Sequence, residues 1–156
     1  MKKITLTQGF EAIVDDADYV YLSQFKWLAK NKKYAARSPS RRCISRNFIY
    51  MHRVILGLVP SSGLFADHID GNGLNNVRSN LRTATKSQNE YNRGKRAHNT
   101  SGFKGVCKSL NKWRAGIKFK GKYTHLGNFS SPILAAKAYD KKAKILHGEF
   151  ARVNFQ

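Results

Sequence analysis

Residues 66–93, ADHIDGNGLNNVRSNLRTATKSQNEYNR, are the stretch of this sequence that says most about its fold. The chain has a net charge of +20, yet this stretch gathers two Asp, one His and six Asn residues. The segments DGNG and NN are strong turn signals, so Asp70, Asn72 and Asn75 are expected to shape a turn. Asp67, His68 and the later amides remain as candidates for chemistry.

The composition favours a polyanionic partner. The chain has 156 residues, with 29 Lys and Arg against 9 Asp and Glu. Residues 100–156 hold 12 of these cations and 2 of the acids, so both halves are basic. Such a field attracts nucleic acid. A ribosome-associated or merely soluble basic protein is the alternative, and a membrane-surface role is disfavoured because no amphipathic helix confines basic residues to one face.

Cysteine usage and hydropathy narrow the class further. Cys43 and Cys107 stand alone with no Cys-x-x-Cys pair, which excludes a zinc ribbon. One disulfide stays possible, although two separate thiols are the default in a reducing compartment. The N-terminal MKKITLTQGF lacks an apolar run, and no segment is apolar enough to span a bilayer. We expect a cytoplasmic protein with no membrane partner.

The chain divides into an N-terminal region and a separate C-terminal unit, together an α+β protein. Residues 1–60 contain short runs rich in Tyr, Ile, Val, Phe and Trp, which predict a small antiparallel β region with one helical turn. We expect residues 1–93 to form one domain, with residues 94–101, GKRAHNTS, as a linker. Residues 102–156 then form the second domain.

The C-terminal unit has a clear pattern of three strands and a helix. GFKGVCKS, KWRAGIKFKG and KYTHLGNFS alternate as short strands, and SSPILAAKAYDKKAKILHG reads as a helix. Pro132 suits a first helical turn, and Gly148 suits the position after the last. We expect a three-stranded antiparallel sheet packed on one helix. The residues expected to share the buried helix face are Leu134, Ala135, Ala138, Ala143 and Leu146.

The other sheet face is predicted to be free, basic and aromatic. A charged strand face is usually only solvated, but this one almost lacks acids, so we expect it to contact double-stranded DNA in the major groove. The predicted DNA-binding residues are Lys104, Arg114, Lys118, Lys120, Lys122, Tyr123 and His125.

This unit resembles the APETALA/ethylene-response-factor DNA-binding domain along its whole length. The matching motifs are GV, W-x-A-x-I, LG-x-F, AA-x-AYD and the terminal NF. The resemblance implies a sheet that docks in the major groove. Plant members usually carry arginine and tryptophan where this chain has Cys107 and His125, so their base specificity does not carry over.

The stretch from Asp67 to Asn92 resembles the HNH endonuclease motif in the variant of phage intron nicking enzymes and their free-standing relatives. The upstream segments LTQGFEAIVDDADYVYLSQFKWLA and MHRVILGL match the same class. The resemblance implies a ββα-metal unit, with FADHID and SNLRTA as strands of a hairpin and TKSQNEYNR as a helix. It also implies a homing-type or site-specific nicking enzyme in a bacterial or phage-infected cell.

The resemblance assigns roles to four residues. Asp67 and Asn89 would bind one divalent ion, Mg²⁺ or Mn²⁺, for which oxygen ligands are suited. His68 would be the general base, because its pKa lies near neutrality. Asn80 would bridge the hairpin loop and orient the histidine. His52 is expected to pack or to contact phosphate rather than to bind metal.

The sequence thus predicts a metal-dependent DNA endonuclease that needs no small-molecule cofactor. One active site cuts one strand, so a monomer would nick and a weak dimer would be needed for paired cuts. Two alternatives stay open. One is a DNA-binding regulatory protein with an inactive HNH site, and the other is a structural protein that binds RNA and DNA equally.

Overall fold

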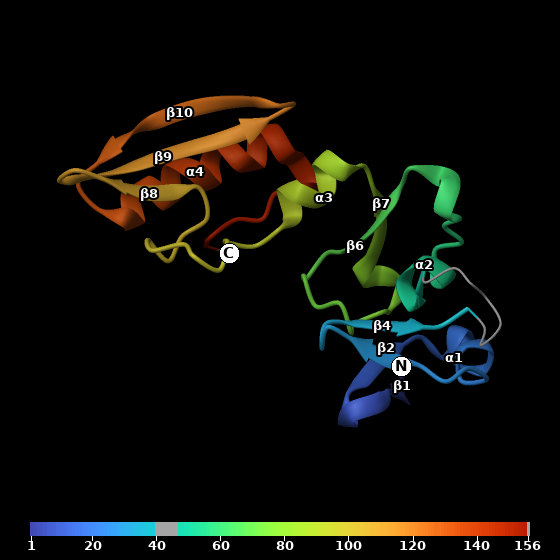
Figure 1. Ribbon diagram of the computed structural model, residues 1–156. Coiled ribbons are helices and arrows are strands. Elements are labelled where there is room, and N and C mark those ends of the chain that lie inside the picture. Colours follow the sequence, from blue (N-terminus) through green and yellow to red (C-terminus); the bar gives the residue numbers. More distant parts are fainter. Residues whose placement is uncertain (40–46, 156) are drawn as a thin grey trace. The chain divides into compact units, whose positions relative to one another are not determined.

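The computed structural model describes residues 1–39 and 47–155, and it forms two compact units, Met1–Lys86 and Ser87–Gln156 (Figure 1). The fold is α+β with several small antiparallel sheets, as the sequence predicts. Cys43 lies outside the described residues, so its predicted thiol state stays a prediction. The division into functional domains at 1–93, 94–101 and 102–156 also stays a prediction. Within the described part of the chain, no helix is long and apolar enough to cross a membrane.

The N-terminal unit is built from short strands and two short helices. Strands β1 and β2 pair as one hairpin, β3, β4 and β5 form a second sheet, and β6 pairs with β7, all antiparallel. The elements are β1 (Lys2–Thr5), β2 (Glu11–Val14), α1 (Asp16–Leu22), β3 (Leu28–Lys30), β4 (Tyr34–Arg37), β5 (Ile49–Tyr50), α2 (Met51–Ile55), β6 (Phe65–His68) and β7 (Leu81–Ala84). Single 3₁₀ turns cover Thr7–Gly9, Pro60–Ser62 and Arg78–Asn80.

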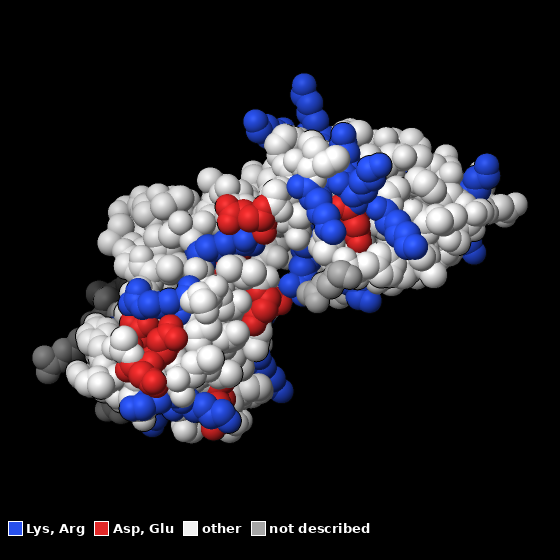
Figure 2. Space-filling model, turned by 180° about the vertical axis from the view of Figure 1, so that it is seen from behind, with Lys and Arg blue, Asp and Glu red and all other residues white. Residues whose placement is uncertain are grey.

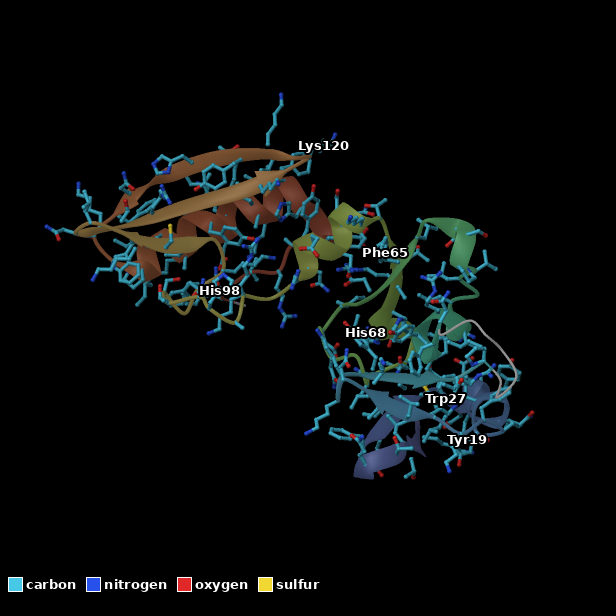
Figure 3. All side chains as sticks on the ribbon, in the orientation of Figure 1. Tyr19, Trp27, Phe65, His68, His98 and Lys120 are labelled. Atoms are coloured by element: carbon cyan, nitrogen blue, oxygen red, sulfur yellow. The ribbon has the colours of Figure 1, made fainter. Side chains whose placement is uncertain are left out.

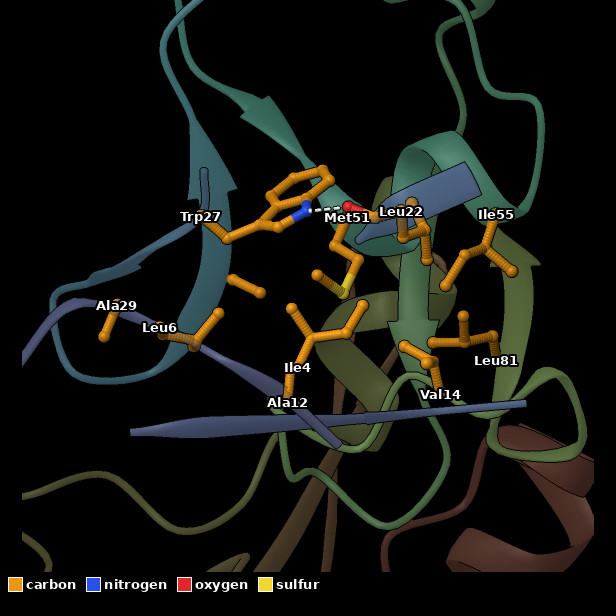
Figure 4. Packing of buried hydrophobic residues seen from close by; sticks show 11 residues of the cluster. Ile4, Leu6, Ala12, Val14, Leu22, Trp27, Ala29, Met51, Ile55 and Leu81 are labelled. Carbon is orange, nitrogen blue, oxygen red and sulfur yellow. Dashed lines mark hydrogen bonds between the residues drawn. The ribbon is translucent and has the colours of Figure 1, made fainter. Parts of the chain in front are cut away.

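One apolar core joins these elements (Figure 4). Trp27 belongs to it and is 2 % exposed, and its indole N–H donates to the Leu22 carbonyl at 2.8 Å. Leu81, the first residue of β7, is buried in the same core. The β6–β7 hairpin is therefore anchored to the body of the unit through β7. The other core residues are Ile4, Leu6, Ala12, Val14, Leu22, Ala29, Ala35, Met51 and Ile55.

The C-terminal unit is a three-stranded sheet with a helix packed on it, as predicted. The strand order is β10-β9-β8, all antiparallel. The elements are α3 (Lys86–Asn92), whose first residue belongs to the N-terminal unit, β8 (Val106–Ser109), β9 (Lys112–Phe119), β10 (Lys122–Phe129) and α4 (Pro132–His147), with a 3₁₀ turn at Gly148–Phe150. Strand β8 begins later than expected, because Gly102 and Gly105 adopt left-handed φ values of 78° and 77° before it.

The N-terminal end of α4 has the predicted cap: the Ser131 hydroxyl accepts from the Leu134 N–H at 3.2 Å, and Pro132 opens the first turn. Gly148 follows the last turn as expected, but its φ of 54° and ψ of −131° lie outside the left-handed helical region. The buried face, however, differs from the prediction. Leu134 is 47 % exposed and was wrongly placed, whereas Tyr139 is buried with Ala135, Ala136 and Ala143. Positions 135, 139 and 143 recur every four residues, so they form the stripe that meets the sheet.

A buried carboxylate closes the end of this unit. Asp140, 7 % exposed, accepts from the backbone N–H of Asn154 at 2.9 and 3.0 Å and from that of Phe155 at 2.9 Å. The Asn154 side chain donates to the Lys104 carbonyl at 3.1 Å and accepts from the Lys104 N–H at 2.7 Å. The segment after α4 is therefore tied to the residues that precede β8.

Candidate active site

Asp67 and His68 are neighbours at the end of β6. Asp67 lies opposite Arg82 in the hairpin register, and its carboxylate accepts from the Arg82 guanidinium at 2.9 Å. The two side chains are 5 % and 13 % exposed, so this ion pair is shielded from water. Because successive strand residues point to opposite faces, Asp67 and His68 reach different neighbours.

The His68 imidazole is held by Asn76. Figure 3 shows where His68 lies in the N-terminal unit. The His68 Nε2 lies 3.2 Å from Asn76 Oδ1, and Asn76 is fully buried. The Asn76 amide N–H donates to the Leu74 carbonyl at 3.1 Å, which turns Oδ1 toward the histidine. Nε2 therefore carries the proton and donates, and a neutral ring then has its lone pair on Nδ1. Reasoning from sequence missed Asn76, since the pair NN reads only as a turn.

His52 and Tyr34 form an aromatic wall beside His68. The His52 and His68 ring centroids are 5.0 Å apart at an edge-on angle of 85°, and the Tyr34 ring lies 6.0 Å from His68. Burial, with the nearby His68 and Arg53, lowers the pKa of His52 to about 3. Burial also lowers the pKa of His68, although Asn76, Asp70 and Asp67 oppose this. Both rings are therefore neutral near pH 7, and His52 packs as expected.

Asn80 and Asp70 organise the loop between the two strands. The Asn80 amide accepts from the Asp70 N–H at 3.0 Å and donates to the Asn75 carbonyl at 2.8 Å and to Asp70 Oδ1 at 2.9 Å. Asn80 thus bridges the loop, while a hydrogen-bond partner of His68 is Asn76. The catalytic role of Asn80 stays a prediction. Although burial opposes the charge, hydrogen bonds from Asn75, Asn72 and Asn80 lower the pKa of Asp70. The predicted turn roles of Asp70, Asn72 and Asn75 are confirmed.

The loop is also tied to the rest of the N-terminal unit. The Ile13 N–H donates to the Leu74 carbonyl at 2.9 Å, and the Asn76 N–H donates to the Ile13 carbonyl at 2.8 Å. Arg78 makes two hydrogen bonds of 2.8 and 2.6 Å to the Asp18 carboxylate on α1. Contacts with β2 and α1 therefore hold the loop that presents Asn76 to His68.

The candidate metal ligands come from different units. Across residues 1–39 and 47–155, no three His, Cys, Asp or Glu side chains gather as a metal site. The predicted ligands are the carboxylate of Asp67, in the N-terminal unit, and the amide of Asn89, on α3 in the C-terminal unit, and this pair stays a prediction. A carboxylate has about four acceptor positions, so its bond with Arg82 is compatible with binding a hard cation through oxygen.

The predicted DNA-binding residues occupy three kinds of position in the C-terminal unit. By register, Arg114, Lys118, Tyr123 and His125 share the sheet face opposite to Ala115 and Ile117, which are buried. Lys120 lies in the turn between β9 and β10, and Lys122 pairs with Phe119. Figure 2, seen from behind the view of Figure 1, shows that Lys and Arg side chains also gather on part of the opposite side of this unit.

Lys104 lies outside the strands of the sheet. It precedes β8, is half-buried, and its ammonium donates to the Tyr91 carbonyl on α3. Burial, with the nearby Arg152, lowers its pKa to about 8. Lys104 therefore contacts α3 instead of extending from a strand.

Comparison with known proteins places the chain in a family. Residues 50–91, which span α2, the hairpin and most of α3, match the model of the HNH endonuclease family. The chain is 34 % identical over 148 residues to an uncharacterised HNH endonuclease of Acanthamoeba polyphaga mimivirus, covering 94 % of this chain and 76 % of that protein. It is 35 % identical over 109 residues to Protein 3.8 of Escherichia phage T7, covering 69 % of this chain and 88 % of that protein.

No solved structure is significantly similar to the chain. The family match spans Asp67 and His68. The chain therefore belongs to the HNH endonuclease family, nucleases that act on nucleic acid and generally use a divalent metal ion.

Proposed function

We propose that the protein is a metal-dependent endonuclease that hydrolyses a phosphodiester bond of double-stranded DNA, with the C-terminal unit as its DNA-docking module. The observation that supports the chemistry best is a buried, neutral His68 whose Nε2 is hydrogen-bonded to Asn76 and whose neighbour along β6 is Asp67. Such an imidazole is prepared to accept a proton.

His68 would act as the general base through Nδ1. It removes a proton from the water that attacks phosphorus, the bond to the leaving 3′ oxygen breaks, and that oxygen takes up a proton from solvent. Asn76 keeps the ring in the required tautomer, and the wall of His52 and Tyr34 limits its rotation. Asp67 and Asn89 would hold Mg²⁺ or Mn²⁺, which when bound stabilises the charge on the phosphate and on the leaving oxygen.

The C-terminal sheet would supply affinity and register on DNA. Its free face carries Arg114, Lys118, Tyr123 and His125, and its resemblance to the APETALA/ethylene-response-factor domain supports docking in the major groove. Cations on this face would bind phosphates, while Tyr123 and His125 reach toward base edges. We propose that a monomer nicks at a site-specific, homing-type target in the cytoplasm of a bacterial or phage-infected cell.

The test is cleavage of a supercoiled plasmid in Mg²⁺ or Mn²⁺, run beside an EDTA control. We expect open-circle product from the wild type and none from His68→Ala. His98→Ala is the matched control, because His98 is exposed in segment 94–101 and should leave cleavage unchanged. Linear product would indicate paired cuts instead of a nick.

Binding is measured on the same DNA by gel shift, because a plasmid can lack the target. Binding without cutting on a library of many sequences would overturn the nuclease proposal and support a DNA-binding protein with an inactive site. Equal affinity for RNA and DNA would overturn the DNA-docking role.

A further inference from the structure

Tyr91 joins three elements of the C-terminal unit. It lies on α3, and its ring stacks on His147 at the end of α4, with ring centroids 3.9 Å apart and planes at 2°. Its hydroxyl accepts from the Lys120 N–H at 3.1 Å, in the turn between β9 and β10. Helix α3 is therefore fixed both to α4 and to the tip of the sheet.

The surroundings of Tyr91 reinforce this attachment. Its carbonyl accepts from the Lys104 ammonium, and the Phe119 ring lies 5.9 Å from its own. His147 is 7 % exposed, and its Nε2 lies 3.1 Å from the Lys118 carbonyl on β9. The histidine on which Tyr91 stacks is thus itself hydrogen-bonded to the sheet, so the stack and this hydrogen bond together attach α3 to the sheet.

The position of Tyr91 gives these contacts a consequence for DNA cleavage. Asn89, a candidate metal ligand, lies on the same short helix. Lys118, a candidate DNA contact, lies on the strand whose carbonyl holds His147. Within this one unit, the helix of the nuclease motif and the docking sheet are joined through side chains. Segment 94–101, which connects them in sequence, does not have to set their spacing.

We propose that Tyr91 is a positioning residue that fixes Asn89 relative to the DNA bound by the sheet and thereby selects the phosphodiester bond that is cut. The proposal rests on the nuclease function proposed above. It also distinguishes two models of how a cutting helix and a docking domain are spaced. In one model, the length of the connecting segment sets the spacing. In the other model, the contacts of Tyr91 set it.

The experiment measures the distance from the recognised motif to the cut on a library of random-sequence duplexes. Selection by binding in EDTA gives the recognised motif, and sequencing of the cut ends in Mn²⁺ gives the distance from motif to cut. Four proteins are compared: wild type, Tyr91→Ala, a variant with four Gly/Ser residues inserted between Gly94 and Lys95, and the two changes together. The insertion site is exposed.

We expect the insertion alone to leave the distance unchanged, because α3 stays attached through Tyr91. Tyr91→Ala should spread the cuts over neighbouring bonds and lower the rate at the original bond by about 100-fold, the usual result of misplacing a reacting group by about 1 Å. The combined variant should spread them further. Tyr91→Phe keeps the ring stack and should cut at the wild-type distance.

The outcomes separate the two proposals. If the wild type selects a motif but never cuts, the nuclease function fails and this proposal fails with it. If the wild type cuts and the insertion shifts the cut, the connecting segment sets the spacing, and only the Tyr91 proposal is overturned. The same holds if Tyr91→Ala cuts at the original bond. Should Tyr91→Ala lose motif binding, His147→Ala removes the stack from the other side and must spread the cuts.

Discussion

At the scale of single residues, His52 shows how the N-terminal unit responds to acid. The imidazole is buried beside His68, and its Nδ1 has no hydrogen-bond partner among the described residues. Its pKa of about 3 lies well below the ordinary 6.5. Between these values the unfolded chain binds a proton that the folded one does not, so stability falls as the pH drops through this window.

We predict that lowering the pH from 7 to 4.5 costs the N-terminal unit roughly 2 kcal/mol through His52 alone. His52→Phe should remove that loss, since phenylalanine does not titrate. The measurement is urea unfolding followed by Trp27 fluorescence, in a Trp113→Phe background because the chain has two tryptophans. If the free energy of unfolding fell equally with and without His52 between pH 7 and 4.5, the assignment of this loss to His52 would be contradicted.

At the scale of elements, the close approach of the site loop to β4 depends on Gly73. A Cβ atom at this position would lie 2.3 Å from the Lys33 carbonyl oxygen and 2.5 Å from the Tyr34 ring. The Tyr34 ring also flanks His68, so a displaced loop would disturb the aromatic wall beside that histidine.

Gly73→Ala should therefore destabilise the N-terminal unit by about 1–3 kcal/mol through overpacking. It should also slow cleavage more than it weakens DNA binding. The matched control is Gly94→Ala, since a Cβ there meets nothing within 4 Å. Unfolding and plasmid cleavage would be measured on both variants, and identical behaviour would show that the loop can shift without cost.

The elements also show what sequence can predict and where it stops. The hairpin, its loop and the N-terminal cap of α4 follow from local signals, because turn residues and Ser131 act within a few positions of the chain. Leu134 was wrongly predicted to be buried because an alanine-rich helix has two faces with small residues. Which face is buried depends on its packing against the sheet. Asn76 was missed because its bond to His68 crosses the whole loop, and nothing local separates it from Asn75.

At the scale of the whole molecule, charge should control DNA affinity. A protein that contacts phosphates releases counterions, so affinity falls with a steep linear dependence of log K on log salt. We predict that Lys118→Ala, on the free sheet face, reduces this slope by about 1. Lys137→Ala, exposed on α4, is the control and should leave the slope unchanged. Equal effects of both variants would indicate diffuse attraction without a defined docking face.

The closure of the C-terminal unit by Asp140 and Asn154 has a consequence for synthesis on the ribosome. Strand β8 and the residues before it are made early, but their bonds to Asn154 wait until that residue has left the exit tunnel. The N-terminal unit ends at Lys86, so its core residues have all emerged before then. In the growing polypeptide the unit with His68 is therefore able to fold while the unit that would bind DNA is still incomplete.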